Sequence, residues 1–180
     1  MVTFFWSDTH FNHAGIIRYC SRPYGSVAEM NVELIKRWNS VVKPNDTIWL
    51  LGDFAFSVSG GDDLSDIFSM LHGRKHLIVG NHDERNPKVM KLGWESVVPL
   101  RTVKDHGMRA EVCHYPLETW KKADGGALML HGHSHGTLKR VVPHRFDVGC
   151  DVQEVPVSFE ELWATAQSQT FEAADHHGDL

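Results

Sequence analysis

The sequence predicts an α/β sandwich, a fold in which helices pack against two β-sheets. In the first half of the chain, apolar runs of strand length alternate with amphipathic helical patterns, which is typical of βαβ units. The second half consists mostly of short extended segments separated by turns. Several apolar runs are followed directly by polar clusters, as at the edge where α/β sheets bind ligands.

The first half is predicted to contain three strands and three helices. The helix over residues 27–42 is the clearest, because Ser26 and Glu29 have the spacing of a capping box and Pro44 follows its last turn. The predicted strands cover residues 2–6, 47–51 and 76–79, and the other helices cover 64–71 and a short stretch after Pro87.

The second half is predicted to be mainly extended, with a final helix that begins at the capping box of Ser158 and Glu161. The expected extended segments cover residues 97–103, 109–113, 127–130, 138–142 and 145–149. A chain of 180 residues favours one domain, so we expect a single domain over residues 1–169. Residues 170–180 are polar and are predicted to form a flexible tail.

Composition excludes several classes of function. With 42% hydrophobic and 23% charged residues the chain is typical of globular proteins, and no apolar run reaches the length of a membrane span. Its net charge of −5 and its lack of a dense basic cluster argue against stable nucleic-acid binding. Three scattered cysteines and the lack of a signal-peptide pattern predict the cytoplasm of a bacterial cell or of a phage-infected host.

Histidine is unusually abundant, and its positions point to metal chemistry. The chain has 13 histidines, and several lie in the polar clusters that follow predicted strands. These clusters are Asp8-Thr9-His10, Gly52-Asp53, Gly80-Asn81-His82-Asp83, His114 and Gly132-His133-Ser134-His135. Because side chains at the carboxyl ends of strands converge on one crevice, we expect the clusters to meet there.

The converging side chains are too numerous for one zinc ion and suit two metals that share a carboxylate and a water. Mixed imidazole, carboxylate and amide ligands favour Mn, with Fe, Zn or Ni as alternatives, over Mg or Ca. The i, i+2 spacing in Asp8/His10 and in His133/His135 predicts pairs that point the same way from an extended backbone. Gly52, Gly80 and Gly132 precede the clusters and predict tight turns or a close backbone approach to a bound anion.

Taken in order, the five motifs resemble those of the calcineurin-like metallophosphoesterase superfamily. The resemblance implies a four-layer αββα sandwich with a dinuclear metal site. It implies that Asp8, His10, Asp53 and His135 bind the first metal, and that Asp53, Asn81, His114 and His133 bind the second. It also implies that His82 is the catalytic acid and that Asp83 orients it.

The stretch SDTHFNHAGIIRYCSRPY, with WN and LGDF further on, is similar to a compact bacterial and phage branch that lacks large capping insertions. The expected function is a dinuclear metal-dependent phosphohydrolase, specifically a phosphodiesterase on small or cyclic nucleotide diesters with a metal-bridging hydroxide as nucleophile. Substrate-binding candidates are Asn12, His13, Arg22 and Arg85. The alternatives are a phosphomonoesterase acting on nucleotides or phosphoproteins, and a metal-bound scaffold that works by binding a partner.

Overall fold

Two β-sheets form the centre of the molecule, and the computed structural model describes residues 1–56 and 63–174. The first sheet contains, in spatial order, β4 (Ser96–Val98), β3 (Arg74–Ile78), β2 (Thr47–Leu50), β1 (Thr3–Trp6) and β9 (Val157–Ser158). The second contains β5 (Leu100–Asp105), β6 (Met108–Cys113), β7 (Leu128–His131) and β8 (Arg145–Asp147). The helices are α1 (Ala14–Tyr19), α2 (Val27–Val41), α3 (Leu64–Met70), α4 (Pro87–Met90) and α5 (Phe159–Gln167).

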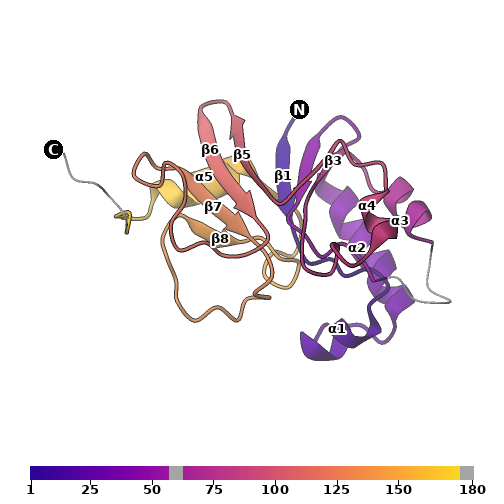
Figure 1. Ribbon diagram of the computed structural model, residues 1–180. Coiled ribbons are helices and arrows are strands. Elements are labelled where there is room, and N and C mark those ends of the chain that lie inside the picture. Colours follow the sequence, from indigo (N-terminus) through magenta and orange to yellow (C-terminus); the bar gives the residue numbers. More distant parts are fainter. Residues whose placement is uncertain (57–62, 175–180) are drawn as a thin grey trace.

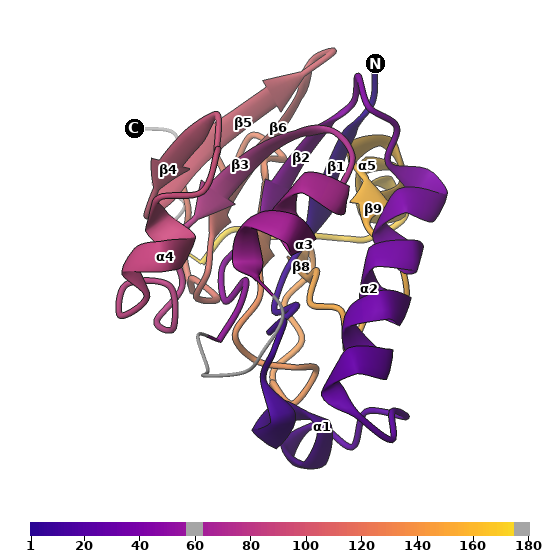
Figure 2. The same ribbon diagram turned by 90° about the vertical axis from the view of Figure 1, so that its right-hand side faces the viewer.

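The first sheet is parallel from β1 to β4, and only β9 runs antiparallel, beside β1. Because side chains alternate along a strand, Phe4 and Trp6 face the helices whereas Phe5 faces the second sheet. Figure 2 shows α2, α3 and α4 lying over this sheet. Burial of Trp38 of α2 against Trp6 anchors the longest helix to the sheet.

The second sheet packs its inner face on the first, and the two share one apolar core (Figure 1). Strands β6, β7 and β8 are parallel, while β5 is antiparallel to β6. Helix α5 adds Phe159, Leu162 and Ala166 to the shared core. The predicted two-sheet α/β sandwich is therefore confirmed. On the outer face of the second sheet, Trp120 and its neighbouring turns cover Met129.

The two sheets meet where β1 and β8 end. Ser7 and Gly149 form an isolated parallel bridge, and the Cys150 amide donates to the Ser7 carbonyl over 2.9 Å. The loops that follow β1, β2, β3, β6 and β7 therefore open along one edge of the sandwich, which is the edge that carries the polar motifs.

Three predicted details differ from the structure. The extended segment at 97–103 is split at Pro99 into β4 and β5, which belong to different sheets. The predicted segment 138–142 forms no strand; its side chains are largely exposed, and β8 pairs with β7 only from Arg145 onward. Helix α1 and the two-residue strand β9 were not predicted, because α1 has no side-chain cap and β9 is too short to show a period.

The predicted caps can be compared atom by atom. Ser158 and Glu161 form the complete capping box at α5. At α2 the Ser26 hydroxyl accepts the Glu29 amide, but the Glu29 carboxylate turns to the amide of Gly25. Part of the predicted tail, 175–180, lies outside the described residues, and before it Phe171 stacks on Trp120. In the described part, no helix has the length and apolarity to cross a membrane.

Candidate metal centre

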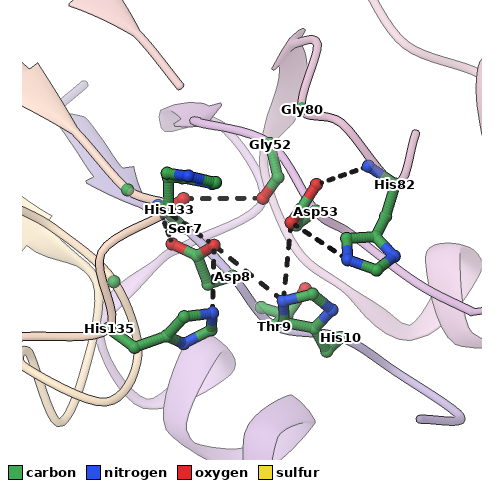
Figure 3. A network of polar contacts seen from close by, with 12 residues as sticks. Ser7, Asp8, Thr9, His10, Gly52, Asp53, Gly80, His82, His133 and His135 are labelled. Carbon is green, nitrogen blue, oxygen red and sulfur yellow. Dashed lines mark hydrogen bonds and ion pairs between the residues drawn. The ribbon is translucent and has the colours of Figure 1, made fainter. Parts of the chain in front are cut away.

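Asp8 and Asp53 form the centre of the polar edge, and Figure 3 shows the rings of His10, His82 and His135 next to them. Nε2 of His10 lies 3.6 Å from Oδ2 of Asp53 and 3.9 Å from Oδ1 of Asp8. Nε2 of His114 lies 3.5 Å from Oδ2 of Asp53, and Nε2 of His135 lies 3.9 Å from Oδ1 of Asp8. The structure thus brings together residues that are far apart in the sequence.

The hydrogen bonds of His114 show which of its nitrogens is available to a metal. Nδ1 lies 2.8 Å from the carbonyl oxygen of Leu51, a pure acceptor, so the ring must donate there. In the neutral ring Nε2 then carries a lone pair, and it faces Oδ1 of Asn81 at 3.1 Å as well as the Asp53 carboxylate. Lone pairs that face one another in this way are satisfied by a cation placed between them.

His10 gives a second, independent indication that a metal ion binds here. Its ring is buried, and neither Nδ1 nor Nε2 has a hydrogen-bond partner. Buried polar atoms are almost always satisfied, so a group with two unpaired nitrogens calls for an explanation. Burial, assisted by the positive charge of Arg22, also holds the pKa of His10 well below its usual value, so the ring is neutral as a metal ligand requires.

The buried carboxylate of Asp8 would be stabilised by a positive charge beside it. Asp8 is fully buried, and burial raises the pKa of its carboxyl group to about 8. An Asp side chain that is this hard to ionise without a cation gains most from a divalent ion nearby. The donor set of imidazole nitrogens and carboxylate oxygens therefore fits transition-metal ions.

The possible ligand groups overlap at the two carboxylates. Of the four sets of described residues whose ligand atoms lie within 4.8 Å of one another, three contain Asp8 or Asp53. These three are Asp8 with His10 and His135, Asp8 with Asp53 and His114, and His10 with Asp53 and His82, whereas the fourth is Cys20 with His135 and Asp151. Both Asp8 and Asp53 belong to two sets, which fits two neighbouring ions. Within the described residues His133 joins none of the sets; its ring packs on Tyr115, and its backbone amide donates to Asp8.

The backbone of the centre is unusual, and it corrects one step of the sequence reasoning. The pairs Asp8/His10 and His133/His135 are predicted to lie on extended backbone, but five of the seven predicted ligands have a left-handed backbone, with φ between 45° and 64°. These are Asp8, His10, Asp53, His133 and His135. Left-handed non-glycine residues are uncommon and concentrate at functional sites, where the surrounding structure enforces them.

Gly132 is required by close packing. A Cβ atom at this position would overlap the Ser7 hydroxyl and lie 2.7 Å from Cβ of Ser7, and it would also overlap the Asp8 carboxylate. Gly80 has the same role beside Asp53, whose amide would lie 2.6 Å from an added Cβ. A tight turn or a close backbone approach to a bound anion is predicted at these glycines, whereas the described neighbours are Ser7 and Asp8 at Gly132 and Asp53 at Gly80.

Asp151 is a functional residue that sequence reasoning missed. Its Oδ2 lies 2.7 Å from Nδ1 of His135, which orients that ring with Nε2 toward Asp8. Burial opposes a charge on His135, but the Asp151 hydrogen bond together with the negative charges of Asp8 and Asp151 raises the pKa of the ring. Asp151 follows no strand-end motif, so only its place beside β8 and Gly149 in the fold reveals it.

Arg22 was predicted as a substrate contact, and the structure corrects this. Its buried guanidinium makes two 2.8 Å bonds to Asp151 and also donates to the carbonyl oxygens of Asp8 and Thr9. Because these bonds use the guanidinium N–H groups, those groups are not available to bind a substrate phosphate. Arg22 therefore fixes Asp151 and the Asp8 loop.

Asp83 was predicted to orient His82, and this is also corrected. Its fully buried carboxylate accepts the backbone amides of Asp53, Phe54 and Gly80, at 2.8 to 2.9 Å. Burial raises the pKa of this carboxyl group to about 7. Asp83 thus fixes the loop that carries Asp53, while His82 is oriented by its own amide, which donates to Oδ1 of Asp53 over 2.9 Å.

The remaining substrate candidates divide into two groups. Asn12 is buried and its side chain accepts a 2.8 Å bond from Asn31 of α2, which corrects its predicted role to a structural one. His13 lies beside the centre, with its ring 5.3 Å from that of His10. Arg85 is exposed and lines a cavity with His82. The substrate roles of His13 and Arg85 therefore stay predictions.

The chain is similar in sequence to proteins from an archaeon and from a mycobacterial phage. No family model matches it. It is 36% identical over 161 residues to the uncharacterized protein MJ1445 of Methanocaldococcus jannaschii, a match covering 86% of this chain and 85% of that protein. It is 28% identical over 195 residues to the gene 66 protein of Mycobacterium phage L5, covering 89% and 92% respectively.

Among solved structures, the protein of unknown function AQ665 from Aquifex aeolicus superposes with a TM-score of 0.70 at 22% identity. That alignment covers 89% of this chain and 97% of AQ665, so the whole fold is shared. The 36% identity over most of both chains shows that this protein belongs to the same family as MJ1445. Its ordered motifs and the buried Asp–His centre of the sandwich resemble those of the calcineurin-like metallophosphoesterase superfamily.

Proposed function

We propose that this protein is a metal-dependent phosphoesterase that hydrolyses small phosphodiesters. The observation that carries the proposal is the set of three histidine Nε2 atoms that face the buried carboxylates of Asp8 and Asp53. When bound there, two divalent ions would polarise a phosphoryl oxygen and lower the pKa of a water nucleophile. Mn²⁺ is the favoured ion because of the mixed nitrogen and oxygen donors.

The chain's own residues supply orientation and a proton. The carboxylates of Asp8 and Asp53 lie in loops fixed by Arg22 and Asp83. His82 has a side chain that is 35% exposed, and it lies between the Asp53 carboxylate and the cavity. This position supports a role for His82 as the acid that protonates the leaving oxygen of the ester.

A preference for diesters over monoesters belongs to the same proposal. The alkoxide that leaves from a nucleotide diester is a poor leaving group, so a proton donor at the position of His82 contributes most there. A phosphomonoesterase would use the same metal centre, and a scaffold protein would keep the metals without turnover. The substrates hydrolysed distinguish the three: a diesterase prefers diesters, a phosphomonoesterase prefers monoesters, and a scaffold hydrolyses neither.

The test is hydrolysis of bis-p-nitrophenyl phosphate and of p-nitrophenyl phosphate by the purified protein, with EDTA and with added Mn²⁺. We expect Mn²⁺-dependent turnover with the diester preferred. Asp53→Asn should lose activity and at least one bound metal, whereas Asp46→Asn, which removes a buried carboxylate bonded to the amides of Val2 and Lys43, should keep both. Faster turnover of the monoester than of every diester would favour the phosphatase, and bound metal without turnover would favour the scaffold.

A further inference from the structure

A cavity of about 600 Å³ opens beside the candidate metal centre. Its volume lies in the usual range of small-molecule sites, roughly 300–1,000 Å³. Asn81 and His82 form the wall shared with the metal centre, and Phe56 and Pro87 contribute apolar surface. A group bound here would therefore lie next to the proton donor proposed above.

Two cations, Arg85 and Lys88, line the same cavity, and among residues 1–56 and 63–174 no acidic residue lines it. Both side chains are exposed, and within residues 1–56 and 63–174 neither has a carboxylate oxygen within 4.0 Å. The chain as a whole carries a net charge of −5, so a cavity whose described lining holds two positive charges and no ion pair within 4.0 Å is a local exception. Such a pair is suited to an anion with several oxygens, above all a phosphate.

Phe56 supplies an oriented aromatic surface. Its ring stacks on the imidazole of His13, with centroids 4.5 Å apart and an interplanar angle of 13°. The His13 ring thus fixes the orientation of Phe56, while 37% of Phe56 remains exposed and lines the cavity. Planar rings such as nucleobases pack well on a surface of this kind.

We propose that this cavity binds the leaving group of the diester, and that this leaving group carries a planar ring and a second phosphate. The inference rests on the proposed phosphoesterase function and names its substrate class: a phosphodiester of a nucleoside phosphate, such as a short oligonucleotide with a terminal phosphate. Phe56 receives the base, and Arg85 with Lys88 receives the terminal phosphate.

The chemical step balances with water as the only co-reactant. A P–O bond forms to the water oxygen, and the P–O bond to the leaving nucleoside breaks. The leaving oxygen takes a proton from His82, and a water proton is released to solvent. The products are one phosphomonoester and one nucleoside phosphate.

The experiment compares the dinucleotide TpT with TpTp and pTpT, which carry an additional phosphate at the 3′ or the 5′ end. Chromatography of the products identifies which nucleoside leaves. The form with its extra phosphate on the leaving nucleoside should have a kcat/KM about tenfold or more above that of TpT, because it gains charge-assisted hydrogen bonds. That ratio should fall to near one in the double variant Arg85→Ala/Lys88→Ala.

A matched control removes a positive charge elsewhere. Lys104 is exposed on β5, next to Asp105, whose carboxylate bonds to Thr3 at the start of β1, the strand end opposite the metal centre. Lys104→Ala should leave the ratio as in the wild type. Phe56→Leu should raise KM for TpT and for the phosphate-bearing forms alike, because all of them contain the base.

The outcomes separate this inference from the proposed function. Equal kcat/KM for all three dinucleotides, or an equal loss on all three in the double variant, would overturn the second-phosphate subsite. Unchanged KM values in Phe56→Leu would overturn the ring contact. In each of these cases, Mn²⁺-dependent hydrolysis of bis-p-nitrophenyl phosphate by the wild type would leave the phosphoesterase function standing. Failure of that hydrolysis would overturn both proposals.

Discussion

At the scale of single residues, the centre combines a buried histidine ring without hydrogen bonds and a buried carboxylate whose charge is disfavoured. His10 has two buried nitrogens without a hydrogen bond, and Asp8 is buried where its charge is disfavoured. Either group alone would cost free energy in a folded protein. Nε2 of His10 lies 3.9 Å from Oδ1 of Asp8, so a single cation between them would stabilise both groups.

His82 yields a prediction at this scale because it is the most exposed of the four histidines whose Nε2 lies within 4.0 Å of Asp8 or Asp53. His82→Ala should lower kcat/KM on a cyclic nucleotide by roughly 10²–10⁴-fold, the usual contribution of a general acid. The loss on bis-p-nitrophenyl phosphate should be clearly smaller, since p-nitrophenolate leaves without a proton. Steady-state rates of both proteins at saturating Mn²⁺ measure the difference.

The control for this prediction is His106→Ala, which removes a highly exposed ring that forms an ion pair with Asp105, outside the centre. It should not affect either substrate. Equal losses on the two substrates in His82→Ala would mean that His82 positions the substrate or a metal, as its membership of one ligand group would allow.

Asp151 yields a second prediction, because it orients a ligand without contacting the carboxylates. Asp151→Ala should weaken Mn²⁺ activation by about 10–100-fold, since His135 loses the acceptor for its Nδ1–H. Asp151→Asn keeps an acceptor oxygen and should lose less. The measurement is the Mn²⁺ concentration for half-maximal activity, with thermal unfolding recorded alongside.

Removing Asp151 also leaves the buried guanidinium of Arg22 without its ion pair, so a loss of stability is expected in both variants. Asp46→Asn serves as the stability control, because its carboxylate bonds to the amides of Val2 and Lys43 at the far end of β1. An Asp151→Ala protein that is less stable but keeps the wild-type Mn²⁺ dependence would show that Asp151 is only structural.

At the scale of elements, the centre depends on loops whose backbones pass close to one another. Gly132→Ala should displace the Asp8 carboxylate, because the added Cβ would overlap both it and the Ser7 hydroxyl. Overpacking of this kind costs about 1–3 kcal/mol. We expect a lower melting temperature together with weaker metal binding, measured by thermal unfolding and elemental analysis.

Gly93→Ala is the matched control, since an added Cβ there would meet only Phe68, at an ordinary 3.6 Å. It should be close to neutral in both measurements. A Gly132→Ala protein with wild-type stability and metal content would contradict the packing that places Gly132 against Asp8.

The sequence predicted most elements of the first half because periodicity and capping chemistry agree there. The box at Ser158 and the helix after Ser26 are examples, and both helices begin at the predicted residue. Prediction failed where a strand has no period of its own, as in β9, or where an exposed apolar residue such as Val141 resembled part of a strand. The positions of the motifs predicted which side chains converge, because the ends of parallel strands share an edge.

The supporting residues of the site could not be predicted in the same way. Arg22 and Asp151 lie 129 positions apart and meet only after the two sheets join at Ser7 and Gly149. Asp83 adjoins His82 in sequence, yet its carboxylate turns to the backbone of the neighbouring loop. Sequence adjacency indicated His82 as the partner of Asp83, whereas the Asp83 carboxylate accepts three backbone amides in the folded protein.

At the scale of the whole molecule, the buried charges couple metal binding to stability. The pKa of Asp8 is raised to about 8 and that of Asp83 to about 7, both by burial. In the unfolded chain both carboxyl groups titrate near pH 4. Between these values the folded, metal-free protein binds more protons than the unfolded chain, so its stability falls as the pH rises.

The lowered pKa of His10 and of His114 acts in the opposite direction, but only up to about pH 7, where unfolded histidines finish losing their protons. The raised pKa of His135 acts in the same direction as those of the carboxyl groups. The window in which the raised groups dominate is therefore about pH 7 to 9. In EDTA, the free energy of unfolding in urea should decrease across this window.

Saturating Mn²⁺ should abolish or reverse this slope, because metal ligands must be deprotonated and binding becomes tighter as Asp8 ionises. Asp8→Asn should flatten the slope in EDTA and also remove most of the stabilisation by Mn²⁺, whereas Asp46→Asn should change neither. Urea unfolding at pH 7, 8 and 9, in EDTA and in Mn²⁺, measures all of these effects. A metal-free protein whose stability is constant or rises over this range would contradict the burial of uncompensated carboxyl groups, and with it the reason the fold gives for binding metal at this edge.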